Sequence, residues 1–135
     1  MNLFLVEDSA CLRDRLTRLI SRVHGARVVG YAATSHEALE KIPQTKPDVV
    51  LLDIHLAQGT GYQVLQQVKR RPRAPIVIVL TNYAYPPYRK KYLEGGADYF
   101  FDKSTEFELM LHALQQLRYR FEPNSRTQMT LCFAV

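Results

Sequence analysis

Short apolar segments alternate with longer amphipathic segments along most of the chain. The apolar segments are Asn2 to Val6, Val28 to Tyr31, Asp48 to Leu52, Ile76 to Leu80 and Tyr99 to Phe101. Several of them are apolar throughout, which is typical of strands that are covered on both faces. Strands that alternate with helices in this way predict an α/β fold with a parallel sheet.

The segments between these strands show helical periodicity, and their ends carry recognisable signals. The first helix is expected to follow Asp8 or Ser9 as its N-cap, because both side chains accept hydrogen bonds from helix N–H groups. The second helix begins near Ser35 and is expected to stop at Pro43, which cannot continue a helix. The third begins at about Gly61.

The last two helices have signals at both ends. Pro86–Pro87 suit a first helical turn, and Gly95–Gly96 suit the left-handed exit of the fourth helix. The fifth helix is expected to open at Ser104 or Thr105, where Thr105 and Glu108 have the spacing of a capping box.

Length and composition favour a single globular domain. The chain has 135 residues, a net charge of +5 and two cysteines that lie in no metal-binding spacing. The longest apolar runs are too short to cross a bilayer, and the N-terminus lacks the pattern of a signal peptide, so a cytoplasmic location is expected. We assign residues 1–121 to the domain and residues 122–135 to a linker or C-terminal tail.

Polar residues follow four of the predicted strands, where ligands of open α/β sheets bind. In chain order they are Glu7, Asp8, Asp53, Thr81, Asp102 and Lys103. Three carboxylates in one crevice repel one another unless a positive charge compensates them. Lys103 and a divalent cation are the candidates, and oxygen-only ligands favour Mg²⁺.

These residues and their order resemble the receiver domain of two-component response regulators, over residues 2 to 121. The resemblance is carried by "LVEDS" with Glu7 and Asp8, "VVLLDIHL" with Asp53, "VIVLTN" with Thr81 and "GADYFFDKS" with Lys103. It implies a flavodoxin-like fold, in which five helices cover both faces of a five-stranded parallel sheet of order 2-1-3-4-5.

The resemblance also implies a chemistry. Asp53 would accept a phosphoryl group from a histidine kinase or a phosphotransfer protein, with Lys103 and Thr81 contacting the phosphoryl group. Mg²⁺ would be held by Glu7, Asp8 and Asp53 and by the backbone carbonyl of His55. The protein would catalyse only its own phosphorylation and dephosphorylation, so it is not expected to be an enzyme in the ordinary sense.

A conformational switch follows from the same resemblance. Thr81 would move toward the phosphoryl group, and the aromatic side chain of Phe100 would turn into the space that Thr81 leaves. This would reshape the face formed by the fourth helix, fifth strand and fifth helix, and so signal to an output domain, an effector protein or a second copy in a phosphorylation-dependent homodimer. Nucleic acid would be bound only through an output domain that this chain lacks.

Two alternatives remain open. The first is a degenerate receiver that acts as an interaction module without accepting phosphate. The second is a hydrolase of the haloacid type, which would require an acid two residues after the nucleophile, where this chain has His55.

The sequence departs from the common family pattern around the site. Ser104 stands where proline usually follows the lysine, and Phe100 stands where tyrosine is frequent. His55, Asn82 and Tyr83 are expected at the rim of the phosphoryl site. We hypothesise that His55 and Tyr83 shield the acyl phosphate from water and that Asn82 narrows access to Asp53.

The basic side chains are unevenly distributed. They gather on the first helix at Arg13, Arg15, Arg18 and Arg22, on the fourth at Arg89, Lys90 and Lys91, on the fifth at Arg118 and Arg120, and at Lys69 to Arg73. Those of the fourth and fifth helices would attract an acidic partner if they share one face, although solvated helix faces are the commoner explanation of such charges.

Overall fold

The computed structural model describes residues 1–121 and contains one five-stranded parallel sheet. The strands are β1 (Asn2–Val6), β2 (Arg27–Ala32), β3 (Val49–Leu52), β4 (Ile76–Thr81) and β5 (Tyr99–Asp102). Their spatial order is β2-β1-β3-β4-β5, so the predicted receiver topology is confirmed. Each strand lies within one residue of its predicted position at either end.

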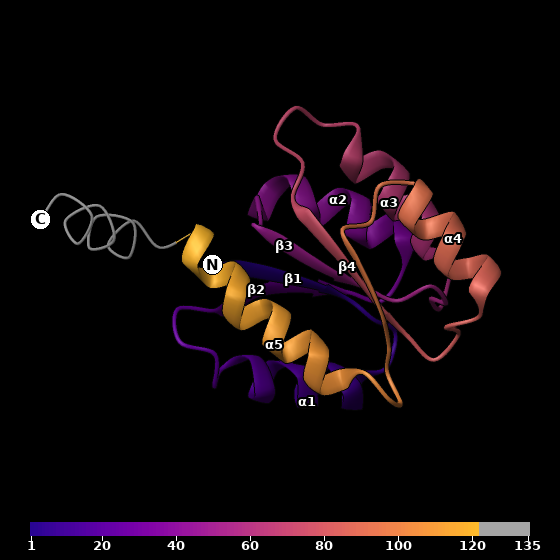
Figure 1. The fold of residues 1–135 in the computed structure, drawn as a ribbon. Coiled ribbons are helices and arrows are strands. Elements are labelled where there is room, and N and C mark those ends of the chain that lie inside the picture. The colour runs from indigo at the N-terminus through magenta and orange to yellow at the C-terminus, as the bar shows by residue number, and fades with distance from the viewer. Residues whose placement is uncertain (122–135) are drawn as a thin grey trace, which may run out of the picture.

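Helices cover both faces of the sheet, as Figure 1 shows. The helices are α1 (Ala10–Ile20), α2 (Ser35–Thr45), α3 (Gly61–Lys69), α4 (Pro86–Glu94) and α5 (Phe107–Leu117), and the 3₁₀ helix η1 (Arg118–Arg120) follows α5. One face packs against α1 and α5, and the other packs against α2, α3 and α4.

The alternation of side chains along each strand explains these two layers. In β1, Leu3 and Leu5 belong to the core cluster beneath α1 and α5, whereas Phe4 and Val6 belong to the cluster beneath α2, α3 and α4. All four side chains are at most 1% exposed. Because successive strand residues point to opposite faces, a strand between two helical layers must be apolar at every position.

Four predicted helix starts are confirmed. Ser9 is the N-cap of α1 and accepts a hydrogen bond from the backbone N–H of Leu12 at 3.2 Å. The second helix begins at Ser35 and the third at Gly61. The fourth helix has Pro86 and Pro87 in its first turn. Its C-cap Gly95 keeps a right-handed conformation, and the positive φ expected at this exit is found at Gly96, with φ of 109°.

The predicted end of the second helix is wrong. The helix continues through Pro43 and ends at Thr45. Its C-cap is Lys46, whose backbone adopts the left-handed conformation with φ of 47°. Proline removes only one N–H donor, and here it lies in the last turn of the helix.

The predicted start of the fifth helix is also wrong. The helix begins at Phe107 with Glu106 as its N-cap, so Thr105 and Glu108 do not form a capping box. A capping box is present instead in α3, between Thr60 and Gln63. In addition, Arg118 and Arg120 belong to η1 rather than to the fifth helix.

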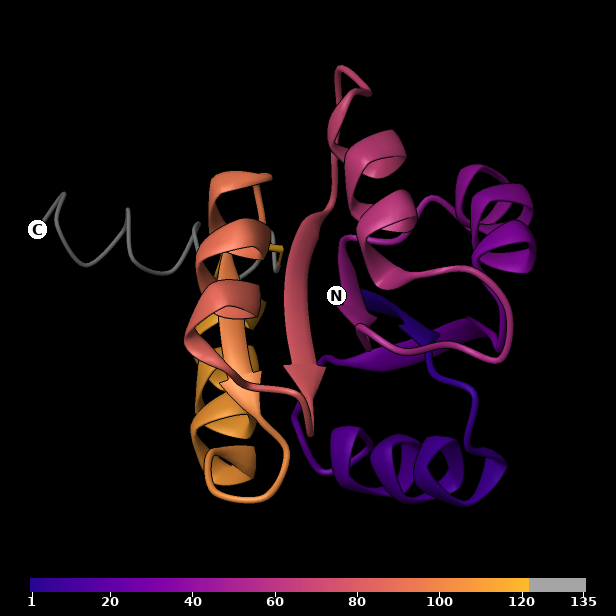
Figure 2. The ribbon, with the colours of Figure 1, turned by 90° about the vertical axis from the view of Figure 1, so that its right-hand side faces the viewer.

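Figure 2 shows β4 and β5 side by side with their arrowheads at the same end of the molecule. The residues that follow the strands therefore gather at one edge of the sheet. Among residues 1–121, none of the helices is both long and apolar enough to cross a membrane. The predicted linker or tail, residues 122–135, lies outside the described residues.

Candidate functional site

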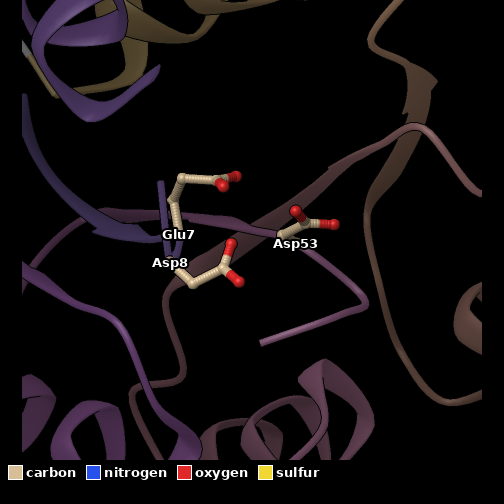
Figure 3. Close-up of side chains that lie close together, drawn as sticks. All are labelled: Glu7, Asp8 and Asp53. Atoms are coloured by element: carbon tan, nitrogen blue, oxygen red, sulfur yellow. The ribbon is translucent and has the colours of Figure 1, made fainter. Parts of the chain in front are cut away.

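The carboxyl ends of β1 and β3 bring three acidic side chains together. Glu7 and Asp8 follow β1 directly, and Asp53 follows β3, which pairs with β1 through Val6 and Leu52. Each of the three carboxylates offers an oxygen, and these oxygens lie within 4.8 Å of one another. Figure 3 shows the three side chains directed toward a common space. The predicted convergence of the acids is confirmed.

Lys103 is the positive charge within this cluster. Its ammonium Nζ donates to Asp53 Oδ2 at 2.8 Å and to Glu7 Oε2 at 2.7 Å. The lysine follows β5, and its backbone N–H donates to the carbonyl of Thr81 at the end of β4. All three paired side chains are less than a tenth exposed, so solvent screens these ion pairs poorly.

Burial and charge shift the pKa values of this network. Burial raises the pKa of Glu7 from 4.5 to about 7, although the hydrogen bond from Lys103 acts in the opposite direction. The charge of Asp53 raises the same pKa further. Burial acts to lower the pKa of Lys103, but its hydrogen bonds to Asp53 and Glu7 outweigh that effect and leave the pKa raised. Lys103 therefore stays protonated at neutral pH.

The backbone around Asp53 holds its carboxylate in place. The N–H of Ile54 donates to Asp53 Oδ1 at 2.7 Å, and the N–H of Asp53 donates to the carbonyl of Val6 at 3.0 Å. Gly61 lies so close that a Cβ atom there would overlap the carbonyl oxygen of Asp53. The start of α3 can therefore pack against the Asp53 backbone only because residue 61 has no side chain.

Thr81 and Phe100, which the resemblance predicts to act as a switch, are both buried. Thr81 is fully buried at the end of β4, and its hydroxyl accepts a hydrogen bond from the N–H of Tyr83 at 3.1 Å. Phe100 is only 3% exposed. Its ring centroid lies 6.2 Å from that of Tyr92 and 5.8 Å from the guanidinium of Arg89, and both of these residues belong to α4. The Phe100 ring thus packs beneath α4.

The residues expected at the rim follow β3 and β4 in the chain, His55 two residues after Asp53 and Asn82 and Tyr83 directly after Thr81. His55 and Tyr83 are exposed and stack on each other with their ring centroids 3.9 Å apart. Tyr88 of α4 meets the same histidine edge-on at 6.4 Å, and Tyr85 lies 6.3 Å from Tyr88. Asn82 is exposed. The sequence analysis did not single out Tyr85 and Tyr88. Their closeness to Tyr83 in the chain, along the loop and the first turn of α4, was a signal that could have identified them.

Asp102 and Ser104 lie at the turn after β5. The bond between Lys103 and Ser104 is trans, because residues 1–121 contain no cis peptide bond. Asp102 is the last residue of β5 and lies outside the acidic cluster. Hydrogen bonds from the side chain and backbone of Ser104 lower the pKa of Asp102 and fix the turn after the strand.

The donor set fits a hard divalent cation. It consists of carboxylate oxygens alone, from Glu7, Asp8 and Asp53, of which Asp8 is exposed to solvent while the other two are buried. A site with few protein ligands and an open, solvated side suits Mg²⁺, which retains several water molecules when bound. The participation of the His55 carbonyl stays a prediction.

Comparison with known proteins identifies the family. The chain matches the family model of the response regulator receiver domain over residues 3–115. It is therefore a receiver domain of the response regulator family, a class of signalling modules in two-component systems.

Curated relatives and solved structures agree with this assignment. The sensory transduction protein LytT of Bacillus anthracis is 27% identical over 129 residues, which cover 96% of this chain and 51% of LytT. The positive alginate biosynthesis regulatory protein of Pseudomonas aeruginosa is 39% identical over 84 residues, covering 62% of this chain and 34% of that protein. The response regulator domain of Thermotoga maritima CheB has a TM-score of 0.76 at 26% identity, and the match covers 89% of this chain and 94% of that structure.

The receiver of Klebsiella pneumoniae RstA, activated with beryllofluoride, shares the fold with a TM-score of 0.78 at 24% identity, covering 87% of this chain and 98% of that structure. The chain spans about half the length of LytT and of the transcriptional regulatory protein YvfU of Bacillus subtilis, of which it covers 58%.

Proposed function

We propose that this receiver accepts a phosphoryl group on Asp53 from a phosphohistidine and passes the signal on by a change in shape. The observation that carries the proposal is the position of Lys103, which pairs with Asp53 and Glu7 at once. Structural stability alone does not require two buried carboxylates on one lysine with a third carboxylate, that of Asp8, beside them, because an excess of negative charge is costly. A phosphoacceptor that binds a cation gains from that excess.

The chemistry is a displacement at phosphorus. A carboxylate oxygen of Asp53 attacks the phosphoryl group, the P–N bond of the phosphohistidine breaks, and its electron pair returns to the imidazole ring of the donor. Bound Mg²⁺ would neutralise the charge that spreads over the phosphoryl oxygens. Glu7, Asp8 and Asp53 would hold the ion. Lys103 keeps the Asp53 carboxylate oriented before transfer and balances the charge of the phosphoryl group afterwards.

The response begins at Thr81. Its hydroxyl accepts a hydrogen bond from the N–H of Tyr83, and donating its own proton to a phosphoryl oxygen would draw it toward Asp53. The Phe100 ring, which packs under α4, then fills the space that is released. The face of α4, β5 and α5 changes with it, and an effector, an output domain or a second copy that prefers the new face shifts the equilibrium.

The test is labelling with a small phosphodonor. Purified protein is incubated with ³²P-labelled acetyl phosphate with and without Mg²⁺, beside an Asp53→Asn variant. We expect the wild type to take up label only when Mg²⁺ is present, and we expect the Asp53→Asn variant to take up no label. A folded wild type that takes up no label, from acetyl phosphate or from a phosphohistidine donor, would establish a degenerate receiver that works by interaction alone.

The rim residues set the lifetime of the phosphoryl group in this proposal. His55 and Tyr83 stack on each other, and this pair would limit the approach of water to the acyl phosphate. Replacing either His55 or Tyr83 with alanine is expected to accelerate the loss of label severalfold. The Asn82→Ala substitution is expected to widen the access of solvent and phosphodonor to Asp53. Equal decay rates in the wild type and in both stack variants would reject this role.

The partners follow from the same chemistry. The donor is a sensor histidine kinase or a histidine phosphotransfer protein, and the exchange takes place in the cytoplasm. Contact with nucleic acid belongs to an output domain outside this chain, in keeping with the greater length of the relatives.

A further inference from the structure

The carbonyl of Glu7 is held by an arginine that the phosphotransfer chemistry does not use. Arg13 of α1 donates from Nη1 to the backbone oxygen of Glu7 at 2.6 Å. On the other side of the same residue, the N–H of Glu7 donates to the carbonyl of Ala32 in β2 at 2.9 Å. The backbone of Glu7 is thus fixed from both directions.

The Arg13 guanidinium is itself held by an aromatic ring of the edge strand. It lies 4.6 Å from the ring centroid of Tyr31, which is in β2 and is 52% exposed. Lys41 of α2 approaches the same tyrosine, with its Nζ 5.5 Å from the ring centroid and 3.4 Å from the Tyr31 carbonyl. Glu37, one turn earlier in α2, pairs with the Lys41 ammonium at 3.3 Å and restrains it on the side of Tyr31.

We infer that Arg13, seated on Tyr31, is a positioning residue for the Mg²⁺ ligands Glu7 and Asp8; this inference rests on the proposed function. The carbonyl that Arg13 holds belongs to the peptide unit that joins Glu7 to Asp8. A hydrogen bond to that carbonyl fixes the plane of the peptide and therefore the direction in which the Asp8 side chain leaves the backbone. Asp8 is exposed, so neighbouring side chains constrain it less than they constrain Glu7.

A second effect of Arg13 has the opposite sign. Its positive charge close to the acidic cluster disfavours a bound cation, so removing the charge alone would tighten Mg²⁺ binding. Solvent screens this repulsion because Arg13 is only partly buried, whereas the hydrogen bond acts directly on the ligand backbone. Groups that orient metal ligands typically change affinity by tenfold or more when they are removed. Positioning therefore outweighs repulsion.

The experiment is a Mg²⁺ titration of the whole protein followed by ¹H–¹⁵N NMR at the amides of Glu7, Asp8 and Asp53. The variants are Arg13→Ala, Arg13→Lys, Tyr31→Thr and Tyr31→Phe. Arg13→Lys keeps the charge but loses the planar fork, and Tyr31→Phe keeps the ring face that the guanidinium contacts. Thermal unfolding of each variant establishes that it is folded at the titration temperature.

We expect the Mg²⁺ dissociation constant to rise about three- to tenfold in Arg13→Ala, Arg13→Lys and Tyr31→Thr, and to stay at the wild-type value in Tyr31→Phe. Unchanged affinity in both Arg13 variants would overturn the inference while leaving the proposed function intact. Tighter binding in Arg13→Ala with no change in Arg13→Lys would overturn it in favour of simple charge repulsion. A wild type without a saturable Mg²⁺ response at these amides would overturn the proposed function and the inference together.

Discussion

Neutralising Glu7 should change how the stability of the metal-free domain depends on pH. The pKa of Glu7 is raised from 4.5 to about 7, chiefly because the carboxyl is buried. The folded protein therefore binds a proton more tightly than the unfolded chain does. The stability that Glu7 contributes is fully present below pH 4.5 and is lost as the pH rises through about 7.

The size of the effect follows from the pKa values. A tenfold change in proton affinity is worth about 1.4 kcal/mol, so the shift of the Glu7 pKa corresponds to a loss of about 3 kcal/mol between pH 4.5 and pH 8. Glutamine has nearly the same shape and no proton to lose. Relative to the wild type, Glu7→Gln should therefore become more stable as the pH rises, by up to about 3 kcal/mol.

The assay is urea unfolding at several pH values between 5 and 8, in the absence of divalent ions. The matched control is Glu94→Gln, an exposed glutamate at the end of α4, which should keep the wild-type pH dependence. Excess Mg²⁺ should reverse the slope for the wild type, because binding requires the carboxylate form. A difference between wild type and Glu7→Gln that is the same at every pH would refute the reasoning.

Three further outcomes test the fold around the site. Gly61→Ala should destabilise the domain by about 1–3 kcal/mol and shift the NMR signals of Asp53 and Ile54, because the added Cβ overlaps the Asp53 carbonyl; unchanged signals would contradict this. Leu114→Ala, in the fully buried contact of α5 with the sheet, should cost about 2–5 kcal/mol in urea unfolding, whereas the exposed Leu109→Ala should cost far less. Ser9→Ala should remove the α1 N-cap and cost about 1 kcal/mol, and Ser9→Asp should restore it.

The sheet and the acidic site were predictable because both depend on strong local signals. Strands such as Val49–Leu52 are apolar at every position, which only a strand covered on both faces allows. Once the strands are parallel, the polar residues after them must meet at one edge, so Glu7, Asp53 and Lys103 come together without further information.

Contacts between distant side chains could not be predicted. In the sequence, Arg13 is one of four arginines predicted for the polar side of the first helix, although Arg22 lies beyond the end of α1 in the structure. Only the register of β1 with β2 brings Tyr31 close to Arg13. The start of α5 was misread because Thr105 and Glu108 have the right spacing, whereas the backbone there forms a turn that Ser104 and Asp102 stabilise. Spacing along the chain does not reveal that hydrogen bonds of a turn compete with those of a capping box for the same backbone segment.

The ammonium that pairs with Glu7 and Asp53 belongs to Lys103, the residue that follows the edge strand β5. During synthesis, the carboxylates of Glu7 and Asp53 leave the ribosome well before Lys103 does, so the growing chain carries them without their counter-charge. Until β5 pairs with β4, the carboxylates of Glu7 and Asp53 lack Lys103. Binding a proton or a dissolved cation would then reduce the repulsion between them. Fraying at that edge of the folded domain would have the same result, because the Asp53 carboxylate would lose its Lys103 partner while the rest of the sheet stays paired.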